Sequence, residues 1–187
     1  MEQKTFNTSY AVRDIAQISL MAAIVFVATK LTGIPVGLGY KGFVHAGDAM
    51  VFVAAIILRR KNAVIASALG MGLFDLLSTA PAWAPFTLII KGVMAYLAAT
   101  IAYRNNYNGE SIVNNIFGFI VGGIWMIGAY YFAGVFLDHY LMGFPWSQCW
   151  ILQATHIGED VAQVIVGMII AVPLSKVLKR IKYFREM

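Results

Sequence analysis

Apolar stretches long enough to cross a membrane are the feature of this sequence that most restricts its fold. Of its 187 residues, 60% are hydrophobic and 12% are charged, whereas a typical soluble domain has about 25% charged residues. One helix needs about 17–25 apolar residues to span the hydrocarbon core of a bilayer, so this length allows about six spans with short connections. We therefore predict an all-α integral membrane protein with six transmembrane helices.

The predicted helices form a single membrane domain that occupies residues 1–187. Their approximate ranges are 14–30, 45–58, 63–78, 86–103, 112–137 and 152–177. The connection after the first helix, residues 31–44, contains four glycines and a proline, and it is too apolar for a solvated linker. Irregular backbone at membrane depth is tolerated only where it is buried in protein or lines a cavity. We expect this loop to fold back over the bundle.

Positive charge is distributed unevenly between the two ends of the predicted helices. Eleven of the fourteen Lys and Arg residues lie near the termini or in the connections after the second and fourth helices. Because connections rich in Lys and Arg stay on the cytoplasmic side, both termini are predicted to be cytoplasmic. The net charge of +5 is thus a topology signal, and we predict no binding to nucleic acid.

Ionisable residues inside the apolar stretches fall near the opposite, outer end of the helices. These residues are His45, Asp48, Asp75, Lys91, His156, Glu159 and Asp160. A charge at membrane depth costs roughly 2.5–3.5 kcal/mol on insertion scales, so it persists where it is paired or meets a ligand. In the last helix Gln153, His156, Asp160 and Gln163 share one face. This pattern predicts a polar cup, open to the outside, that binds a small solute.

Lys91 is the strongest candidate in this cup. It lies some 7–8 Å inside the fourth helix, at about 1.5 Å per residue, and no helix end explains its charge. Asp48 opens the second helix, where the helix dipole stabilises an acid, so we interpret it mainly as a cap. The alternative to a binding site is a set of structural ion pairs, such as Lys91 with Asp75 or with Glu159.

Two short motifs leave a metal site open as an alternative. His45-x-x-Asp48 and His156-x-x-Glu159 each place two ligands at i, i+3, as a zinc site can use them. This spacing is common and its specificity is low. The single cysteine, Cys149, excludes a site with several cysteines. We therefore predict no metal and no cofactor.

The first helix carries a patch of small residues. Ser19 and Ala23 are four residues apart, with Ala22 beside them, a spacing that lets another helix backbone approach closely. The patch can serve packing inside the bundle or face a partner protein.

Two runs of the sequence resemble a known family. The run HAGDAMVFVAAIILRRKNAVIASALGMGLFDLLS followed by PFTLIIKGVMAYLAATIAY is similar to the substrate-binding (S) components of energy-coupling factor (ECF) transporters, in their riboflavin-type branch. The Gly-Asp pair at 47–48 and Lys91 are its most specific elements, and the resemblance covers roughly residues 14–178.

The resemblance implies capture of a vitamin or vitamin precursor from outside, with high affinity and without enzymatic activity. It implies that residues 31–44 act as a lid, and that the fourth to sixth helices contact the ligand. Combined with the polar cup and its aromatic residues, it gives our candidate substrate-binding residues. These are Lys91, His156, Glu159, Asp160, Gln163, Asp75, His45, Trp83, Tyr131 and Tyr40.

The resemblance also implies partners in the prokaryotic plasma membrane. These are a transmembrane coupling protein of the EcfT type and two cytoplasmic ATPases, which would supply the ATP hydrolysis. This chain itself has no Walker A sequence. Family members contact the coupling protein through Ala-xxx-Ala on the first helix, and the candidate docking residues here are Ser19, Ala22 and Ala23.

The cup suits a small flat heterocycle with hydroxyl groups. We favour a pyridoxine-type or hydroxymethylpyrimidine-type ligand, with riboflavin next. A stand-alone channel or proton-coupled carrier would need polar residues in the cytoplasmic halves of the helices, where the apolar stretches have no charge. An intramembrane metal-dependent enzyme is the third class.

Overall fold

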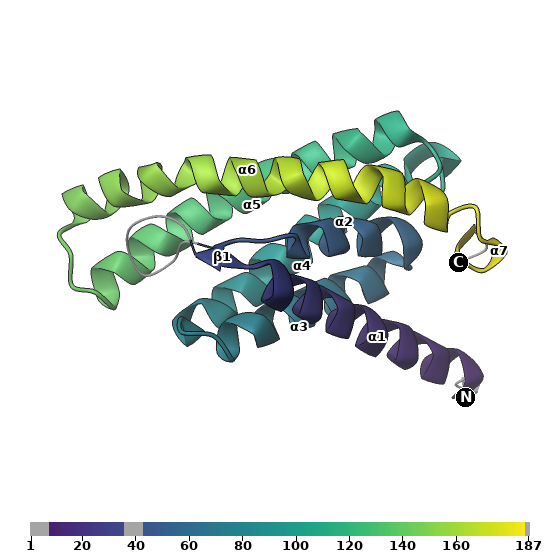
Figure 1. Cartoon of the computed structure of the whole chain (residues 1–187), viewed down its shortest axis with the longest axis horizontal. Helices are drawn as coiled ribbons and strands as arrows, with labels where there is room; N and C mark the ends of the chain where they lie inside the picture. The colour runs from purple at the N-terminus through teal and green to yellow at the C-terminus, as the bar shows by residue number, and fades with distance from the viewer. Residues whose placement is uncertain (1–7, 36–42, 186–187) are drawn as a thin grey trace, which may run out of the picture.

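The computed structural model describes residues 8–35 and 43–185, and in this part of the chain six main helices form an elongated bundle (Figure 1). The six are α1 (Thr8–Thr32), α2 (Gly47–Ile57), α3 (Arg60–Leu76), α4 (Ala84–Ala102), α5 (Ile112–Tyr140) and α6 (Trp146–Leu178). The shorter pieces are the 3-10 helices η1 (Pro81–Trp83) and η2 (Arg104–Asn106), and the terminal α7 (Lys182–Arg185). Two-residue strands β1 (Ile34–Pro35) and β2 (Phe43–Val44) pair antiparallel.

In the described residues, four segments are long and apolar enough to cross a membrane. They are Ala11–Thr32, Pro81–Ala102, Ile112–Tyr140 and Trp146–Leu178. With 11 and 17 residues, α2 and α3 extend over only about 17 and 26 Å at 1.5 Å per residue. The all-α fold with apolar helices of membrane-spanning length is therefore confirmed. Six spans remain a prediction.

The hairpin of α5 and α6 is longer than the sequence suggested. We expected the fifth helix to end near residue 137 and the sixth to begin near residue 152, but α5 continues to Tyr140 and α6 begins at Trp146. Pro145 occupies the N-cap of α6 with φ −60° and ψ 143°, so it begins a new helix after a short turn. The rings of His139 and Trp146 stack with centroids 4.0 Å apart across this turn. In Figure 1 this hairpin runs past the ends of the other helices.

The short helix α2 lies in the centre of the bundle. Ten of its eleven residues are buried, and it packs against α1, α3, α4 and α6. A helix that is apolar on all sides is stable only when it is surrounded, and here protein surrounds it. Figure 1 shows the α2–α3 connection at the same end of the bundle as the first and last described residues.

Small residues set the distance between neighbouring helices. A Cβ on Gly70 of α3 would lie 2.7 Å from the Ala22 carbonyl oxygen of α1 and 2.7 Å from Val25 Cβ. Gly118 and Gly122 of α5 would likewise bring a Cβ to 2.9 and 3.0 Å from carbonyl oxygens of α4. Gly70, Gly118 and Gly122 therefore serve packing within the bundle.

The first prediction concerns the contact between α1 and α3. Gly70→Ala forces a methyl group into the backbone of α1, so we expect the free energy of unfolding to fall by about 1–3 kcal/mol. Gly128→Ala is the matched control, because no atom lies within 4 Å of a Cβ at this position. Thermal unfolding in detergent measures both, and equal stability of the two variants would contradict the packing described here.

Candidate functional site

A polar pocket lies where α3, η1, α4, α5 and α6 meet. It is lined by His45, Met71, Phe74, Asp75, Ser78, Ala80, Trp83, Thr87, Tyr130, Asp160 and Gln163. The free space inside this pocket is small, with a volume of about 30 Å³.

A buried hydrogen-bonded cluster forms part of the pocket wall. Thr87 Oγ1 donates to Asp75 Oδ2 and lies 3.1 Å from Tyr130 Oη. The ring of Trp83 packs edge to face against Tyr130, with centroids 5.9 Å apart. All four side chains are buried. The wall therefore combines a carboxylate, two hydroxyl groups and an aromatic ring.

The turn between α3 and α4 places this cluster. Ser78 Oγ donates to the Asp75 carbonyl oxygen at 2.8 Å and accepts from the Ala80 amide at 3.0 Å. Pro81 then begins η1, as the fixed φ of proline favours at a helix start. The proline-rich segment between the two helices thus turns the chain so that Asp75 and Thr87 face each other.

A fully buried ion pair adjoins the pocket. Lys91 Nζ lies 2.5 Å from Asp48 Oδ1, and the side chains are 1% and 0% exposed. Gln163 Nε2 donates to the other oxygen, Asp48 Oδ2, at 2.7 Å. Lys91 Nζ also lies 2.8 Å from Met126 Sδ and 5.1 Å from the centroid of the Tyr130 ring. The pair therefore connects α2, α4, α5 and α6.

Two expectations about this pair need correction. Asp48 is not mainly a helix cap, because Ala46 is the N-cap of α2 and no side chain caps that end. Its carboxylate binds Lys91 and Gln163 instead, since a charge buried at this depth needs a partner more than the helix end does. The partner of Lys91 is thus Asp48, and neither Asp75 nor Glu159. Lys91 lies beside the pocket and does not line it.

The polar face of α6 divides among three contacts. Asp160 and Gln163 line the pocket. His156 Nδ1 lies 3.2 Å from Glu159 Oε2, and these side chains pair with each other outside the pocket wall. Gln153 Nε2 donates to Asp138 Oδ2 at 2.6 Å. Residues that share this face of α6 therefore do not all lie in the same pocket.

Among the aromatic candidates, Trp83 lines the pocket and is 2% exposed. Tyr131 does not, since its hydroxyl donates to the Trp150 carbonyl oxygen at 3.2 Å. Its neighbour Tyr130 occupies the pocket instead, and Tyr130 follows Met126 by one helical turn, a spacing that points to the face of the ion pair. Tyr40 lies outside the described residues.

Sequence reasoning also missed Thr87, Met71 and Phe74 as pocket residues. Thr87 precedes Lys91 by four residues, so helical spacing alone places it on the same face of α4. Met71 and Phe74 carry no polar signal and read as ordinary core residues. His45, predicted from the sequence, does line the pocket.

The small-residue patch of α1 is only partly exposed. Ser19 and Ala23 are exposed, whereas Ala22 is 7% exposed and lies against α3 at Gly70. Ala22 therefore takes part in packing within the bundle. In the described residues, no group of three or more His, Cys, Asp or Glu side chains is arranged to hold a metal ion.

A buried polar pocket at one end of an apolar helical bundle is typical of a membrane protein that binds a solute. Residues 9–180 match the family described as ECF-type riboflavin transporter, S component, and the chain belongs to this family. It is therefore the S component of an ECF-type vitamin transporter. The members of this family are transporter subunits and not enzymes. The resemblance seen in the sequence is thus confirmed.

Individual relatives are more distant. An uncharacterised protein of Pyrococcus woesei is 28% identical over 156 residues, which cover 83% of this chain and 95% of that protein. The thiamine precursor transporter HmpT of Lactococcus lactis subsp. cremoris is 22% identical over 90% of this chain and 89% of its own. The solved structure of the S component of a bacterial ECF transporter has a TM-score of 0.72 at 18% identity. This match covers 91% of this chain and 97% of the other, and it shows a shared fold.

The second prediction concerns the buried ion pair. Asp48→Asn leaves the Lys91 ammonium group buried without a counter-charge, so we expect the free energy of unfolding to fall by about 3–5 kcal/mol. The double variant Asp48→Asn/Lys91→Met removes both charges, and it should be more stable than Asp48→Asn alone. Thermal unfolding in detergent tests this order. If the loss of unfolding free energy in the double variant equals the sum of the losses that each substitution causes alone, the two residues are not coupled.

Proposed function

We propose that this S component captures a single-ring thiamine precursor of the hydroxymethylpyrimidine type from outside the cell. The observation that carries the proposal is the buried cluster of Asp75, Thr87 and Tyr130 beside Trp83, in a pocket with little free space. The similarity to HmpT, a thiamine precursor transporter, supports the same class of substrate.

The chemistry of the pocket wall complements an aminopyrimidine. Its exocyclic amino group is a donor, and the carboxylates of Asp75 and Asp160 are acceptors. Its ring nitrogens are acceptors, and hydroxyl groups such as that of Tyr130 are donors. Trp83 and Phe74 supply aromatic surface for a flat ring. A site built from such hydrogen bonds rejects ligands that leave its polar groups unpaired.

Size and functional groups separate the rival ligands. Riboflavin has three fused rings and a ribityl chain, so the pocket walls would have to move much farther to admit it than to admit a single ring. Pyridoxine is comparable in size to hydroxymethylpyrimidine, but it has no amino group for the carboxylates. Hydroxymethylpyrimidine therefore ranks first, pyridoxine second and riboflavin third, although the family description names riboflavin.

For the topology we infer six spans in the prokaryotic plasma membrane, with both termini cytoplasmic. The Lys and Arg connections gather at one end, which supports this orientation. We also infer that the loop over residues 31–44 is the lid of the pocket. The pairing of Ile34–Pro35 with Phe43–Val44 brings the two ends of the loop together, and His45, directly after β2, lines the pocket.

Transport through the bilayer would depend on partners. On the cytoplasmic side of the ion pair the core is closed by apolar packing, such as Phe52 stacked on Phe119 with centroids 4.4 Å apart. This packing argues against a stand-alone channel or carrier. We infer that a coupling protein of the EcfT type and two ATPases drive release. Ser19 and Ala23, exposed on α1, would let the coupling protein approach closely.

The third prediction tests the pocket. Calorimetry without ATP should show tight binding of hydroxymethylpyrimidine and none of riboflavin. Because a hydrogen bond to a charged group contributes about 1.5–3 kcal/mol, Asp75→Asn should weaken binding about tenfold to a hundredfold. Glu159→Gln is the matched control, since it neutralises a carboxylate outside the pocket wall. Tight riboflavin binding, or equal effects of the two substitutions, would count against the proposal.

The fourth prediction tests docking. Ala23→Leu adds bulk to the exposed face of α1, so we expect it to abolish uptake by cells while the purified variant still binds its ligand. Gly128→Leu places the same leucine side chain on α5, where a Cβ meets no atom within 4 Å, and uptake should persist. If uptake survives Ala23→Leu, the docking surface lies elsewhere.

A further inference from the structure

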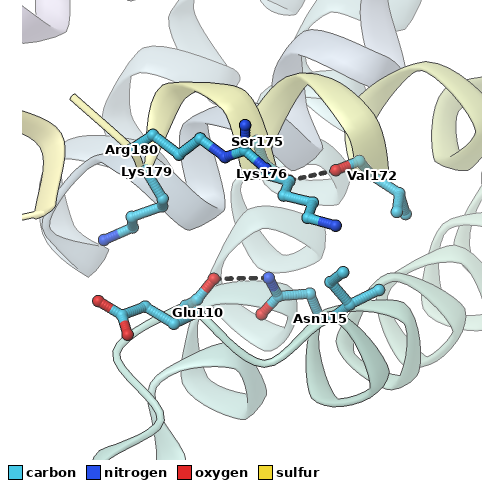
Figure 2. Close-up of a pocket in the computed structure, with 9 residues that line it drawn as sticks. Glu110, Asn115, Val172, Ser175, Lys176, Lys179 and Arg180 are labelled. Atoms are coloured by element: carbon cyan, nitrogen blue, oxygen red, sulfur yellow. Dashed lines mark hydrogen bonds between the residues drawn. The ribbon is translucent and has the colours of Figure 1, made fainter.

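A second pocket lies at the other end of α6, between its last turns and the start of α5 (Figure 2). Its volume is about 260 Å³, much larger than the free space of the first pocket. Lys176 lies in α6, Lys179 is its C-cap and Arg180 follows the cap, and Glu110 and Asn115 stand opposite. Neither the sequence pattern nor the proposed vitamin site explains this pocket.

The pocket carries excess positive charge. Lys179 is held in place because its Nζ donates to Tyr103 Oη at 3.0 Å. Burial lowers the pKa of Lys179, and Glu110 acts in the opposite direction. Lys176 and Arg180 are exposed, and among the described residues neither side chain has a hydrogen-bond or ion-pair partner. Two positive charges therefore remain without a counter-charge.

The backbone beneath these cations also favours an anion. Helix α5 begins at Ile112, which lines the pocket, and the first amides of a helix attract negative charge. Gly109 has φ +73°, and a Cβ there would lie 3.2 Å from the Ile56 carbonyl oxygen and 3.3 Å from Lys179 Cε. Asn115 Nδ2 donates to the Gly109 carbonyl oxygen at 2.7 Å. The loop is thus fixed closely under Lys179.

One buried oxygen atom in this wall lacks a hydrogen-bond donor among the described residues. Asn115 is 5% exposed, and its Oδ1 has no hydrogen-bond partner among the described residues. A buried polar atom without a partner destabilises the folded protein. A hydroxyl group of a ligand would satisfy it, whereas a bare anion would not.

The position of the pocket favours a lipid. The membrane-spanning segment of α5 begins at Ile112, and that of α6 ends at Leu178. The pocket therefore lies at the level where a bilayer has its phosphate groups. Basic pockets between helices at this level bind anionic lipid headgroups.

We propose that this pocket binds the headgroup of an anionic phospholipid that carries hydroxyl groups, as phosphatidylglycerol does. The phosphate lies between Lys176, Arg180 and the first amides of α5, and a headgroup hydroxyl donates to Asn115 Oδ1. The bound lipid ties the end of α5 to the end of α6.

The experiment measures retained lipid on the full chain. The protein is reconstituted into nanodiscs of phosphatidylglycerol and phosphatidylcholine, and native mass spectrometry counts the lipids that stay bound. In Lys176→Gln/Arg180→Gln we expect phosphatidylglycerol retention to fall about tenfold, because each surface cation strengthens such binding several-fold. The matched control is Arg59→Gln/Lys61→Gln, which removes two exposed cations at the start of α3 and should retain the lipid.

Three outcomes would overturn the proposal. Retention is unchanged in the pocket variant, or it falls equally in the control. The third outcome is that inorganic phosphate binds stoichiometrically to the lipid-free protein in neutral detergent, and that the same two substitutions abolish this binding. The pocket would then be a site for free phosphate. Thermal unfolding in that detergent verifies that the pocket variant is folded, as the exposure of both side chains leads us to expect.

Discussion

The buried contact between Asp48 and Lys91 is the interaction on which the rest of the structure depends. Two charges in an apolar core are tolerated only when each neutralises the other and the remaining hydrogen-bonding capacity is satisfied. Here the second carboxylate oxygen accepts from Gln163, and Lys91 also contacts Met126. Because these residues belong to α2, α4, α5 and α6, the pair fixes the relative positions of four helices. It also explains why a helix as short as α2 lies in the centre.

The ion pair and the polar pocket beside it are parts of one polar system. Gln163 contacts Asp48 and also lines the pocket, and Thr87 lies one helical turn from Lys91 on α4. Tyr130 hydrogen-bonds within the pocket cluster and lies near the Lys91 ammonium group. A ligand that rearranges the pocket therefore acts on groups that also hold the bundle together. Such a link is one physical route from ligand capture to a change in helix packing.

The sequence predicted the helical class and the order of the helices well, because long apolar stretches and the positions of Lys and Arg are strong signals. It predicted which residues pair much less well. Depth in the membrane identified Lys91 and Asp75 as special, but depth does not say which opposite charge lies across the bundle. Tyr130 and Tyr131 differ by one residue and hence by about 100° around the helix, which sequence alone did not resolve.

The length of α6 accounts for the other differences between the predicted site and the observed one. The face shared by Gln153 and Gln163 extends over about 15 Å at 1.5 Å per residue, so it passes several different neighbours. Only its last part reaches the pocket. The pocket at the other end of α6 was invisible in the sequence, because its Lys and Arg residues were fully explained as a topology signal. Because these residues lie close to the start of α5, we propose that they also bind an anionic headgroup.

The central claim is that the outer pocket captures a single-ring pyrimidine. The measurement that tests it most directly is the mass spectrum of the small molecule that copurifies with the protein from cells, compared with the Asp75→Asn variant. The account predicts a hydroxymethylpyrimidine mass with the native protein and its loss in the variant. A flavin mass, retained in both, would contradict it.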